Sequence, residues 1–414
     1  MPIIVQKYGG TSVATTERIQ AVADRVVRAK EDGYDVLVAV SAMGHTTDDL
    51  LAMAKQISSI PEPRELDMLL TAGERIAMSL LAIAVNARGC KAASYTGSQA
   101  GIITDTQHGA ARIVEIRPKR ILESLGEGNV VIVAGFQGLS TNYDITTLGR
   151  GGSDTTAVAM AAAVGAEVCE IYTDVQGVFT ADPRIEPAAH KVERISYEEM
   201  LELSASGAKV LSSRSVEYAR RHGVKLHVRS SFEDVAGTWV QEVDERQMEG
   251  VLISGVALDN DEAKVTLDRV PDRPGVAATV FRAIAGEGIS VDMIVQNVSH
   301  EGATDLSFTA PLADIPRLQS VMERVVKEID ATRFSIDDEI SKVSLVGAGM
   351  KAHPGVAADL FDALAAEGIN IEMISTSPIR ISCVIRKADA ERAVRTIHAR
   401  FELDRDGARP ADTP

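Results

Sequence analysis

The hydrophobic and polar positions of the chain change period repeatedly along its first 230 residues. Short apolar runs typical of strands alternate with amphipathic helical patterns such as VATTERIQAVADRVVRAK and ELDMLLTAGERIAMSLLAIAVNARG. The strand-like runs are residues 2–5, YDVLVAVSAM, KAASYTG, GNVVIVAGFQG, EVCEIYTDVQGV and VKLHVRSS. This alternation predicts an α/β unit over residues 1–230, with a largely parallel sheet whose ligands gather where strands end.

The second half of the chain contains a repeat. PGVAATVFRAIAGEGISVDMI (274–294) and PGVAADLFDALAAEGINIEMI (354–374) are identical at 13 of 21 positions. Each copy predicts a ferredoxin-like βαββαβ module. The first module, 264–337, supplies its own last strand, whereas 338–404 lacks one. The strand VLISGVALD, within 251–263, is predicted to complete the second sheet, so that the first module is inserted into the second.

The segments outside these units carry weaker patterns. Residues 231–250 are acidic and weakly periodic, and are predicted to connect the first unit to the repeats. Residues 405–414 are predicted to be a disordered tail. The N-terminus lacks the features of a signal peptide, and no apolar run of about 18–20 residues is uninterrupted, so we expect a cytosolic protein that does not cross a membrane.

The net charge limits the kinds of binding partner, and the cysteine content indicates the redox compartment. The net charge of −16 disfavours nonspecific binding to nucleic acids or anionic membranes, so anionic ligands must meet local positive charge. Cys90, Cys169 and Cys383 lie far apart without metal-ligand spacing, which is typical of buried cysteines in a reducing compartment.

Two glycine-rich loops are candidates for phosphate binding. KYGGTS follows the first strand, and TTLGRGGSD precedes an alanine-rich helix. Backbone N–H groups can approach phosphate oxygens closely where side chains are absent, and Lys7 or Arg150 would add positive charge. The simpler alternatives are a glycine turn with a solvated lysine and an ordinary helix cap. Neither loop matches the G-x-x-x-x-G-K-[ST] or G-x-G-x-x-G patterns.

Taken in order along the chain, several motifs resemble those of aspartate kinases. They are KYGGTS, SAMGHTTDDL, LLTAGERIA, SYTGSQAGI, VAGFQG, TTLGRGGSDTTAV, YTDVQGVFTADPR and the paired PGVAA repeats. The resemblance covers about residues 2–402 and implies an amino-acid kinase fold followed by two ACT domains. It implies the reaction of ATP with L-aspartate to give ADP and 4-phospho-L-aspartate, the first step towards lysine, threonine and methionine. It also implies Mg²⁺ carried by the nucleotide, with no metal bound by the protein alone.

The same resemblance assigns roles to individual residues. Lys7 would bridge the transferred phosphoryl group, Asp154 would orient Lys7 or the metal shell, and Glu74 would receive the aspartate ammonium. The implied ATP contacts are Lys7, Tyr8, Gly9, Gly10, Ser41, Asp154, Thr173, Asp174, Phe179, Asp182, Arg184 and Lys209. The implied aspartate contacts are Thr47 in the loop 41–49, Glu74, Arg150, Gly151, Gly152 and Ser153. The alternatives are a surface salt bridge for Asp154 and, for Glu74, a helix-surface acid paired with Arg75 or Arg64.

The ACT repeats imply binding of amino-acid effectors, lysine and threonine, at Pro-Gly loops before helices. The implied contacts are Asp272, Gly275, Val276, Ala277, Asp292, Gln296, Asn297, Gly355, Val356, Asn370, Ile371 and Thr376. Ala352 stands in the second copy where the first has Asp272. The alternative is a pair of purely dimerising modules. A homodimer or higher oligomer through the ACT domains is expected, and a start at Met248, giving a short regulatory subunit, stays open.

Two other functions remain compatible with the sequence. One is another amino-acid or carbamate kinase that uses the same nucleotide site. The other is a catalytically silent amino-acid sensor. Glu74, Arg150 and the repeated module favour aspartate kinase over the first, and Lys7, Asp154 and Arg184 together favour a kinase over the second.

Overall fold

The computed structural model describes residues 1–243, 252–297, 302–348, 350, 353 and 355–405. Its contacts separate two compact units. The first unit comprises Met1–Val178, Lys191–Ser204 and the described part of Lys209–Gln247. The second unit comprises Phe179–His190, Ala205–Ala208 and the described part of Met248–Pro414. The predicted tail lies, apart from residue 405, outside the described residues, as does Met248.

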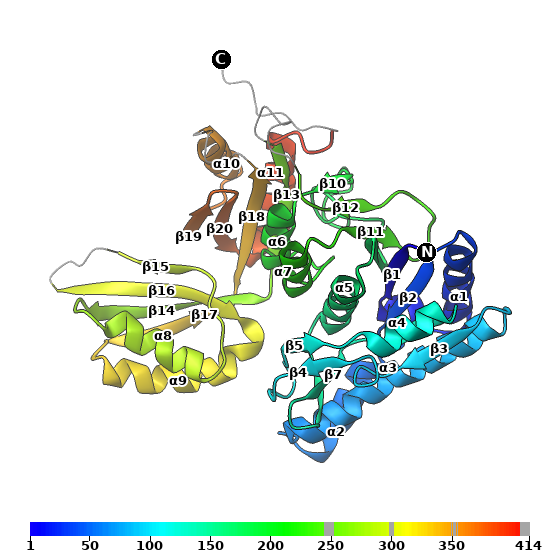
Figure 1. The fold of residues 1–414 in the computed structure, drawn as a ribbon. Coiled ribbons are helices and arrows are strands. Elements are labelled where there is room, and N and C mark those ends of the chain that lie inside the picture. The colour runs from blue at the N-terminus through cyan, green and yellow to red at the C-terminus, as the bar shows by residue number, and fades with distance from the viewer. Residues whose placement is uncertain (244–251, 298–301, 349, 351–352, 354, 406–414) are drawn as a thin grey trace. The chain divides into compact units, whose positions relative to one another are not determined.

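An eight-stranded sheet forms the centre of the first unit, in the order β10-β12-β11-β9-β1-β2-β6-β3 (Figure 1). All neighbouring strands are parallel except β11 and β12. The strands are β1 (Ile3–Tyr8), β2 (Asp35–Val40), β3 (Ala92–Tyr95), β6 (Val130–Ala134), β9 (Val168–Thr173), β10 (Arg194–Ile195), β11 (Leu226–Ser230) and β12 (Thr238–Val240). The largely parallel sheet predicted from the alternating pattern is therefore confirmed.

A smaller sheet and seven α-helices complete the described part of the first unit. The small sheet has the order β5-β4-β7-β8, with β4 (Ile102–Thr104), β5 (Ile113–Ile116), β7 (Gln137–Ser140) and β8 (Ile145–Thr147). The helices are α1 (Thr16–Glu31), α2 (Thr46–Ile57), α3 (Pro63–Asn86), α4 (Lys119–Gly126), α5 (Gly152–Val164), α6 (Tyr197–Ala205), whose last residue belongs to the second unit, and α7 (Ser213–His222).

Helix α3 is the one helix of the described residues that is long and apolar enough to span a membrane by those two criteria. Half of its most apolar window is buried inside the protein, and its buried face includes the acidic residues Asp67 and Glu74. A core helix of this kind meets the same criteria of length and composition.

The first strand is longer than its apolar run predicted. It continues through Gln6 and Lys7 to Tyr8, because the polar side chains on both faces have partners: Gln6 donates to Glu170, and Lys7 pairs with Asp154. A 3-10 turn, η1 (Gly10–Val13), follows, and α1 begins only at Thr16, where Thr15 accepts a hydrogen bond from the Arg18 amide. The helical pattern therefore predicted the start of α1 too early.

Part of the predicted connector is a strand. β12 occupies Thr238–Val240 and pairs antiparallel with β11, so this part of 231–250 belongs to the large sheet. Its run of three residues is too short to produce a recognisable alternation in sequence.

The described part of the second unit contains two four-stranded antiparallel sheets. One has the order β15-β16-β14-β17, with β14 (Glu262–Pro271), β15 (Ile294–Gln296), β16 (Ala303–Pro311) and β17 (Arg333–Asp337). The other has the order β13-β18-β20-β19, with β13 (Leu252–Asp259), β18 (Ile340–Ala348), β19 (Met373–Ser377) and β20 (Arg380–Arg386). β13 occupies the place in the second sheet that β17 has in the first, which is the pairing expected from the sequence.

Two helices pack on each of these sheets. α8 (Val276–Gly286) and α9 (Ile315–Glu328) lie side by side on the first sheet, and α10 (Gly355–Ala366) and α11 (Ala390–Arg400) cover the second (Figure 1). Between the modules, the fully buried Lys342 of β18 pairs with Glu262 and with Asp292, each at 2.5 Å. These carboxylates outweigh the cost of burial and raise the pKa of Lys342.

Candidate active site

The ends of the parallel strands bring the predicted catalytic loops together. Tyr8, the last residue of β1, is level with Val40 of β2 and Tyr172 of β9, and Val40 is level with Ala134 of β6. Hydrogen bonds continue this edge beyond the strands, because the Ser41 amide donates to the Tyr8 carbonyl and the Gly135 amide to the Val40 carbonyl. The carboxyl edge of a parallel sheet is where α/β proteins bind ligands.

Lys7 and Asp154 form an ion pair at this edge. The distance from Lys7 Nζ to Asp154 Oδ1 is 2.6 Å, and each side chain is 12% exposed. The pair is therefore largely buried, which excludes the alternative of a surface salt bridge for Asp154. Asp154 lies in the first turn of α5, whose N-cap, Gly151, has a left-handed φ of 69°. A carboxylate in the first turn of a helix lies close to its exposed amides and positive dipole end.

The loop after β1 has two glycines, Gly9 and Gly10, and therefore no side chain at these positions next to Lys7. A Cβ atom at Gly9 would lie 3.4 Å from Lys7 Nζ, and one at Gly10 would lie 3.0 Å from the carbonyl oxygens of Ala42 and Gly44. Gly10 is therefore required for close packing of this loop on the loop that follows β2. Gly9 leaves the backbone next to the lysine ammonium open to a third group.

Glu74 is buried at the same edge. It is 3% exposed, and its Oε2 atom has no hydrogen-bond partner among the described residues. Burial raises the pKa of Glu74 to about 7, although backbone amides at Glu74 and Ala42 oppose the shift. The alternative of a surface acid is wrong, because Glu74 lies inside and Arg64 pairs with Glu65 and Asp144 instead.

Helix α3 packs closely, beside Glu74, on the loop that follows β2. A Cβ atom on Gly73 would lie 2.8 Å from the Cβ of Ala42 and 3.4 Å from Thr46 Cγ2. Thr47 does not lie in the loop predicted for it. It lies in the first turn of α2, where Asp48 and Asp49 favour a helix start by interacting with the helix dipole.

The loop before α5 carries Arg150, and the first turn of α5 carries Ser153. Arg150 is exposed and has no carboxylate partner among the residues described, whereas Ser153 is 8% exposed. A Cβ atom on Gly135 would lie 2.7 Å from Ser153 Oγ, so Ser153 lies against the end of β6. Gly152 is close-packed in turn, because a Cβ there would lie 2.9 Å from both Leu148 and Phe136.

A buried carboxylate that the sequence analysis did not single out fixes this loop. Asp67 is 1% exposed and accepts hydrogen bonds from Thr147 Oγ1 at 2.5 Å and from the Gly109 amide, while its Oδ2 lies 2.8 Å from His108 Nδ1. Arg214 of α7 donates to the carbonyl of Leu148, the residue after Thr147. One signal was available: Asp67 and Glu74 stand seven residues apart, on the same face of an apolar helix.

The predicted ATP contacts are divided between the two units. Ser41, Thr173, Asp174 and Lys209 belong to the first unit, with Thr173 at the end of β9 and Lys209 exposed in the turn between α6 and α7. The predicted contacts grouped with the second unit are Phe179, Asp182 and Arg184. Within that unit, Arg184 Nη2 lies 2.6 Å from Asp182 Oδ2, and its Nε donates to both carboxylate oxygens.

The predicted effector residues lie in both modules of the second unit. Gly275 caps α8 with a φ of 97°, Val276 is buried in the first turn, and Asp272 is exposed. Gln296 ends the edge strand β15, and Asn297 accepts a hydrogen bond from Thr304. Asp292 is already bound to Lys342. The remaining contacts are Ala277 on α8, Gly355 and Val356 on α10, Asn370 and Ile371 before β19, and Thr376 on β19; Ala352 lies outside the described residues.

Comparison with known proteins assigns these parts to families. Residues 2–230 match the amino acid kinase family, and residues 264–330 and 343–401 each match ACT domain models. The aspartokinase of Mycolicibacterium smegmatis is 54% identical over 98% of this chain and 97% of its own length. The aspartate kinase of Pseudomonas putida is 50% identical over 98% of both chains.

Solved structures agree with the sequence relatives. E. coli aspartokinase III in complex with aspartate and ADP superposes with a TM-score of 0.83 and 26% identity, covering 97% of this chain and all of the other. The same enzyme in complex with lysine and aspartate superposes with a TM-score of 0.73 and 26% identity over 96% of this chain and 99% of the other. The chain therefore belongs to the aspartokinase family of phosphotransferases, with an amino acid kinase domain and two ACT domains.

Proposed function

We propose that the first unit transfers the γ-phosphoryl group of ATP to the β-carboxylate of L-aspartate, giving ADP and 4-phospho-L-aspartate. The observation that carries this proposal is the buried Glu74, whose Oε2 lacks a partner at the strand edge that also holds the Lys7–Asp154 pair. An amino-acid ammonium supplies the missing partner and restores the charge of the carboxylate.

The reaction needs charge stabilisation rather than a base. The β-carboxylate of aspartate is ionised near neutral pH, so its oxygen attacks the γ-phosphorus directly while the bond to the ADP oxygen breaks. No proton has to move. The Lys7 ammonium lies beside the backbone of Gly9, where it stabilises the negative charge of the transferred phosphoryl group. Asp154 positions this ammonium through the ion pair at 2.6 Å.

The acceptor is oriented by groups of opposite charge. Glu74 receives the ammonium, and the exposed guanidinium of Arg150 receives the α-carboxylate in a bidentate contact. Ser153, Thr47 and the backbone of Gly151 and Gly152 complete this site. The Asp67 and Arg214 contacts hold the loop that carries Arg150 and leads into Ser153 of α5.

For the nucleotide, we propose contacts from Tyr8, Gly10, Ser41, Thr173, Asp174, Phe179, Asp182, Arg184 and Lys209. Mg²⁺, when carried by the nucleotide, neutralises phosphate charge. Among the described residues no group of three or more His, Cys, Asp or Glu side chains is arranged to hold a metal ion. We propose that Asp154 lies near the shell of the ion that ATP would carry.

We further propose that the ACT modules bind threonine, with lysine, through Asp272, Gly275, Val276 and Gln296, and that pairing with a second subunit covers their exposed sheet edges. E. coli aspartokinase III, a relative in fold, has been solved with lysine bound. The pathway assignment, lysine, threonine and methionine synthesis, rests on the same family membership.

The deciding experiment measures ADP release with L-aspartate, L-glutamate and carbamate as acceptors, each with and without lysine and threonine. We expect turnover with L-aspartate alone among the three. Preference for another acceptor would refute the assignment of Glu74 and Arg150, and absence of ADP release with all three would point to a silent sensor.

A further inference from the structure

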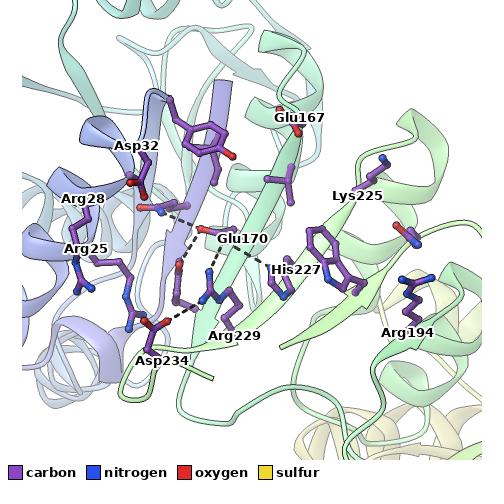
Figure 2. Close-up of a pocket in the computed structure, with 18 residues that line it drawn as sticks. Arg25, Arg28, Asp32, Glu167, Glu170, Arg194, Lys225, His227, Arg229 and Asp234 are labelled. Atoms are coloured by element: carbon purple, nitrogen blue, oxygen red, sulfur yellow. Dashed lines mark hydrogen bonds and ion pairs between the residues drawn. The ribbon is translucent and has the colours of Figure 1, made fainter. Parts of the chain in front are cut away.

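A cleft of about 660 Å³ opens on one face of the large sheet (Figure 2). One wall is formed by Arg25 and Arg28 of α1 and by Asp32, the residue that follows this helix, and the strands β1, β9, β10, β11 and β12 form the floor. Side chains alternate across a strand, so Gln6 of β1 lies in this cleft whereas Lys7 contacts α5 on the opposite face. The cleft is therefore separate from the candidate active site.

A row of polar and aromatic residues crosses the floor. The strand registers place Arg194, Trp239, His227, Glu170 and Gln6 opposite one another on five neighbouring strands. Strands of parallel sheets covered by helices are usually apolar on both faces. Here Leu226 and Val228 of β11 are buried, while Lys225, His227 and Arg229 alternate with them and line the cleft.

In the inner half of this row, which consists of Glu170 and Gln6, the protein itself supplies partners for the polar and charged groups. Glu170 accepts hydrogen bonds from Gln6 at 3.0 Å, Tyr172 at 2.9 Å and Arg229 at 3.0 Å, and Tyr8 donates to Gln6. Figure 2 shows Arg229 between Glu170 and Asp234, to both of which it is bonded. This half needs no further ligand to satisfy its charges.

In the outer half of the row, around Trp239 and Arg194, positive charges lack carboxylate partners in the described part of the chain. Trp239 stacks on His227 with ring centroids 4.0 Å apart and an interplanar angle of 7°. Burial, aided by the charge of Arg229, lowers the pKa of His227 to about 4, so this ring is neutral near pH 7. Arg194 is level with Trp239, and Lys225 lies two residues before His227 on the same face. Within the described residues, neither Arg194 nor Lys225 has a carboxylate partner.

The local charge also departs from that of the whole chain. Five cationic and four acidic side chains line the cleft, although the chain carries a net charge of −16. Arg229 pairs with two of the acids, Glu170 and Asp234. The rest of the lining has four cations, Arg25, Arg28, Arg194 and Lys225, against two acids, Asp32 and Glu167, so the excess of positive charge lies away from the Glu170 network. A flat ring beside two such cations matches a ligand that carries both a planar ring and an anionic group.

We propose that this cleft is a second small-molecule site, which binds a planar ring bearing a phosphate or a carboxylate, as in a pyrimidine mononucleotide. The ring packs against Trp239, and the anionic group is held by Arg194 and Lys225. The cleft volume lies within the range of about 300–1,000 Å³ found for small-molecule pockets.

Trp239 is the only tryptophan of the chain, so its fluorescence reports on the cleft directly. The full chain is titrated with UMP, orotate, uridine and inorganic phosphate without added ADP or ATP, because an adenine nucleotide also carries a planar ring and phosphates. We expect a saturable change in emission with UMP or orotate, at concentrations at least about tenfold below any response to uridine or phosphate. Tighter binding of UMP identifies the phosphate as the natural anion, and tighter binding of orotate the carboxylate.

Two variants and a matched control test the residues. Lys225→Ala and Arg194→Ala should each raise the dissociation constant about tenfold, as expected for the loss of a charge-assisted hydrogen bond. Arg221→Ala removes the same charge from an exposed position of α7, which packs beside α5, and should change nothing. Calorimetric titration repeats the comparison without relying on emission.

The proposal is overturned if neither UMP nor orotate binds below millimolar concentration. It is equally overturned if uridine or phosphate binds as tightly, or if Lys225→Ala and Arg194→Ala behave like Arg221→Ala. None of these results depends on turnover, so they leave the proposed kinase reaction to its own test.

Discussion

Replacement of Glu74 by glutamine tests both the burial of this carboxylate and its role as the ammonium acceptor. Burial raises the pKa of Glu74 from 4.5 to about 7, so the folded protein binds a proton more tightly there than the unfolded chain does. Between these two values the folded state carries more protons, and the free energy of unfolding must therefore fall as the pH rises. The stability from the protonated form is complete below about pH 4.5 and is lost as the pH passes through 7.

The size of the effect follows from the two pKa values. Integrated over both titrations, the folded protein loses about 2.5 kcal/mol between pH 5 and pH 8 through this one group. Glu74→Gln cannot ionise and so lacks this loss. Relative to the parent, the variant should therefore gain about 2.5 kcal/mol in free energy of unfolding over the same interval, whatever its stability at pH 5.

Urea denaturation of both proteins at pH 5, 6, 7 and 8 measures this difference. Glu65→Gln is the matched control, because it makes the same chemical change on the same helix at a side chain that is 66% exposed. Its difference from the parent should vary far less with pH. A Glu74→Gln difference that is equally flat would show that the buried carboxylate does not titrate as argued.

The catalytic part of the prediction uses the same variant. Since an aspartate ammonium stabilises the ionised carboxylate, Glu74→Gln should raise the KM for aspartate about tenfold or more and leave the KM for ATP nearly unchanged. Aspartate binding to the parent at pH 7 should release a fraction of a proton, measurable by calorimetry in buffers of different ionisation enthalpy. An increase in the KM for ATP instead would place Glu74 outside the acceptor site.

Three further predictions test other parts of the molecule. Lys7→Ala should lower kcat far more than it changes the KM for aspartate in steady-state assays, and near-normal turnover would remove Lys7 from the reaction. Asp67→Asn should cost about 3 kcal/mol in urea denaturation, because it weakens several hydrogen bonds of a buried carboxylate, and should raise the KM for aspartate by loosening the loop of Ser153. Asp272→Ala should relieve inhibition by threonine while kcat without effector stays within about a factor of two or three, since binding coupling is reciprocal and this residue is not assigned to the chemistry. Unchanged inhibition in that variant would place the effector elsewhere.

Much of the architecture could be predicted from the sequence because its signals are local. The alternation of strand and helix patterns fixed the α/β class, and the repeat near 274 and 354 revealed two modules of one kind. The orphan strand at 252–259 could be assigned because one copy lacked a strand that the other had. The glycines beside Lys7 and before Asp154 marked both ends of what proved to be one ion pair.

The limits of these local signals are visible at particular residues. Gln6 and Lys7 interrupt an apolar run but remain in β1, because Glu170 and Asp154 supply partners for their side chains. These partners lie about 150 residues away in the chain, so the local pattern does not reveal them. The short strand β12 gives no periodic signal and exists through its pairing with β11.

The tertiary structure alone decided which charges are buried and which side chains are neighbours. Glu74 occurs in a helix that could have exposed it, and its elevated pKa depends on its burial in the folded chain. Asp67 meets Thr147, and Arg194 becomes level with Gln6 across five strands, through registers that couple distant segments. Desolvation and ion pairing depend on the atoms that surround a side chain in space. The sequence pattern around a residue does not specify those atoms, so it cannot predict either effect.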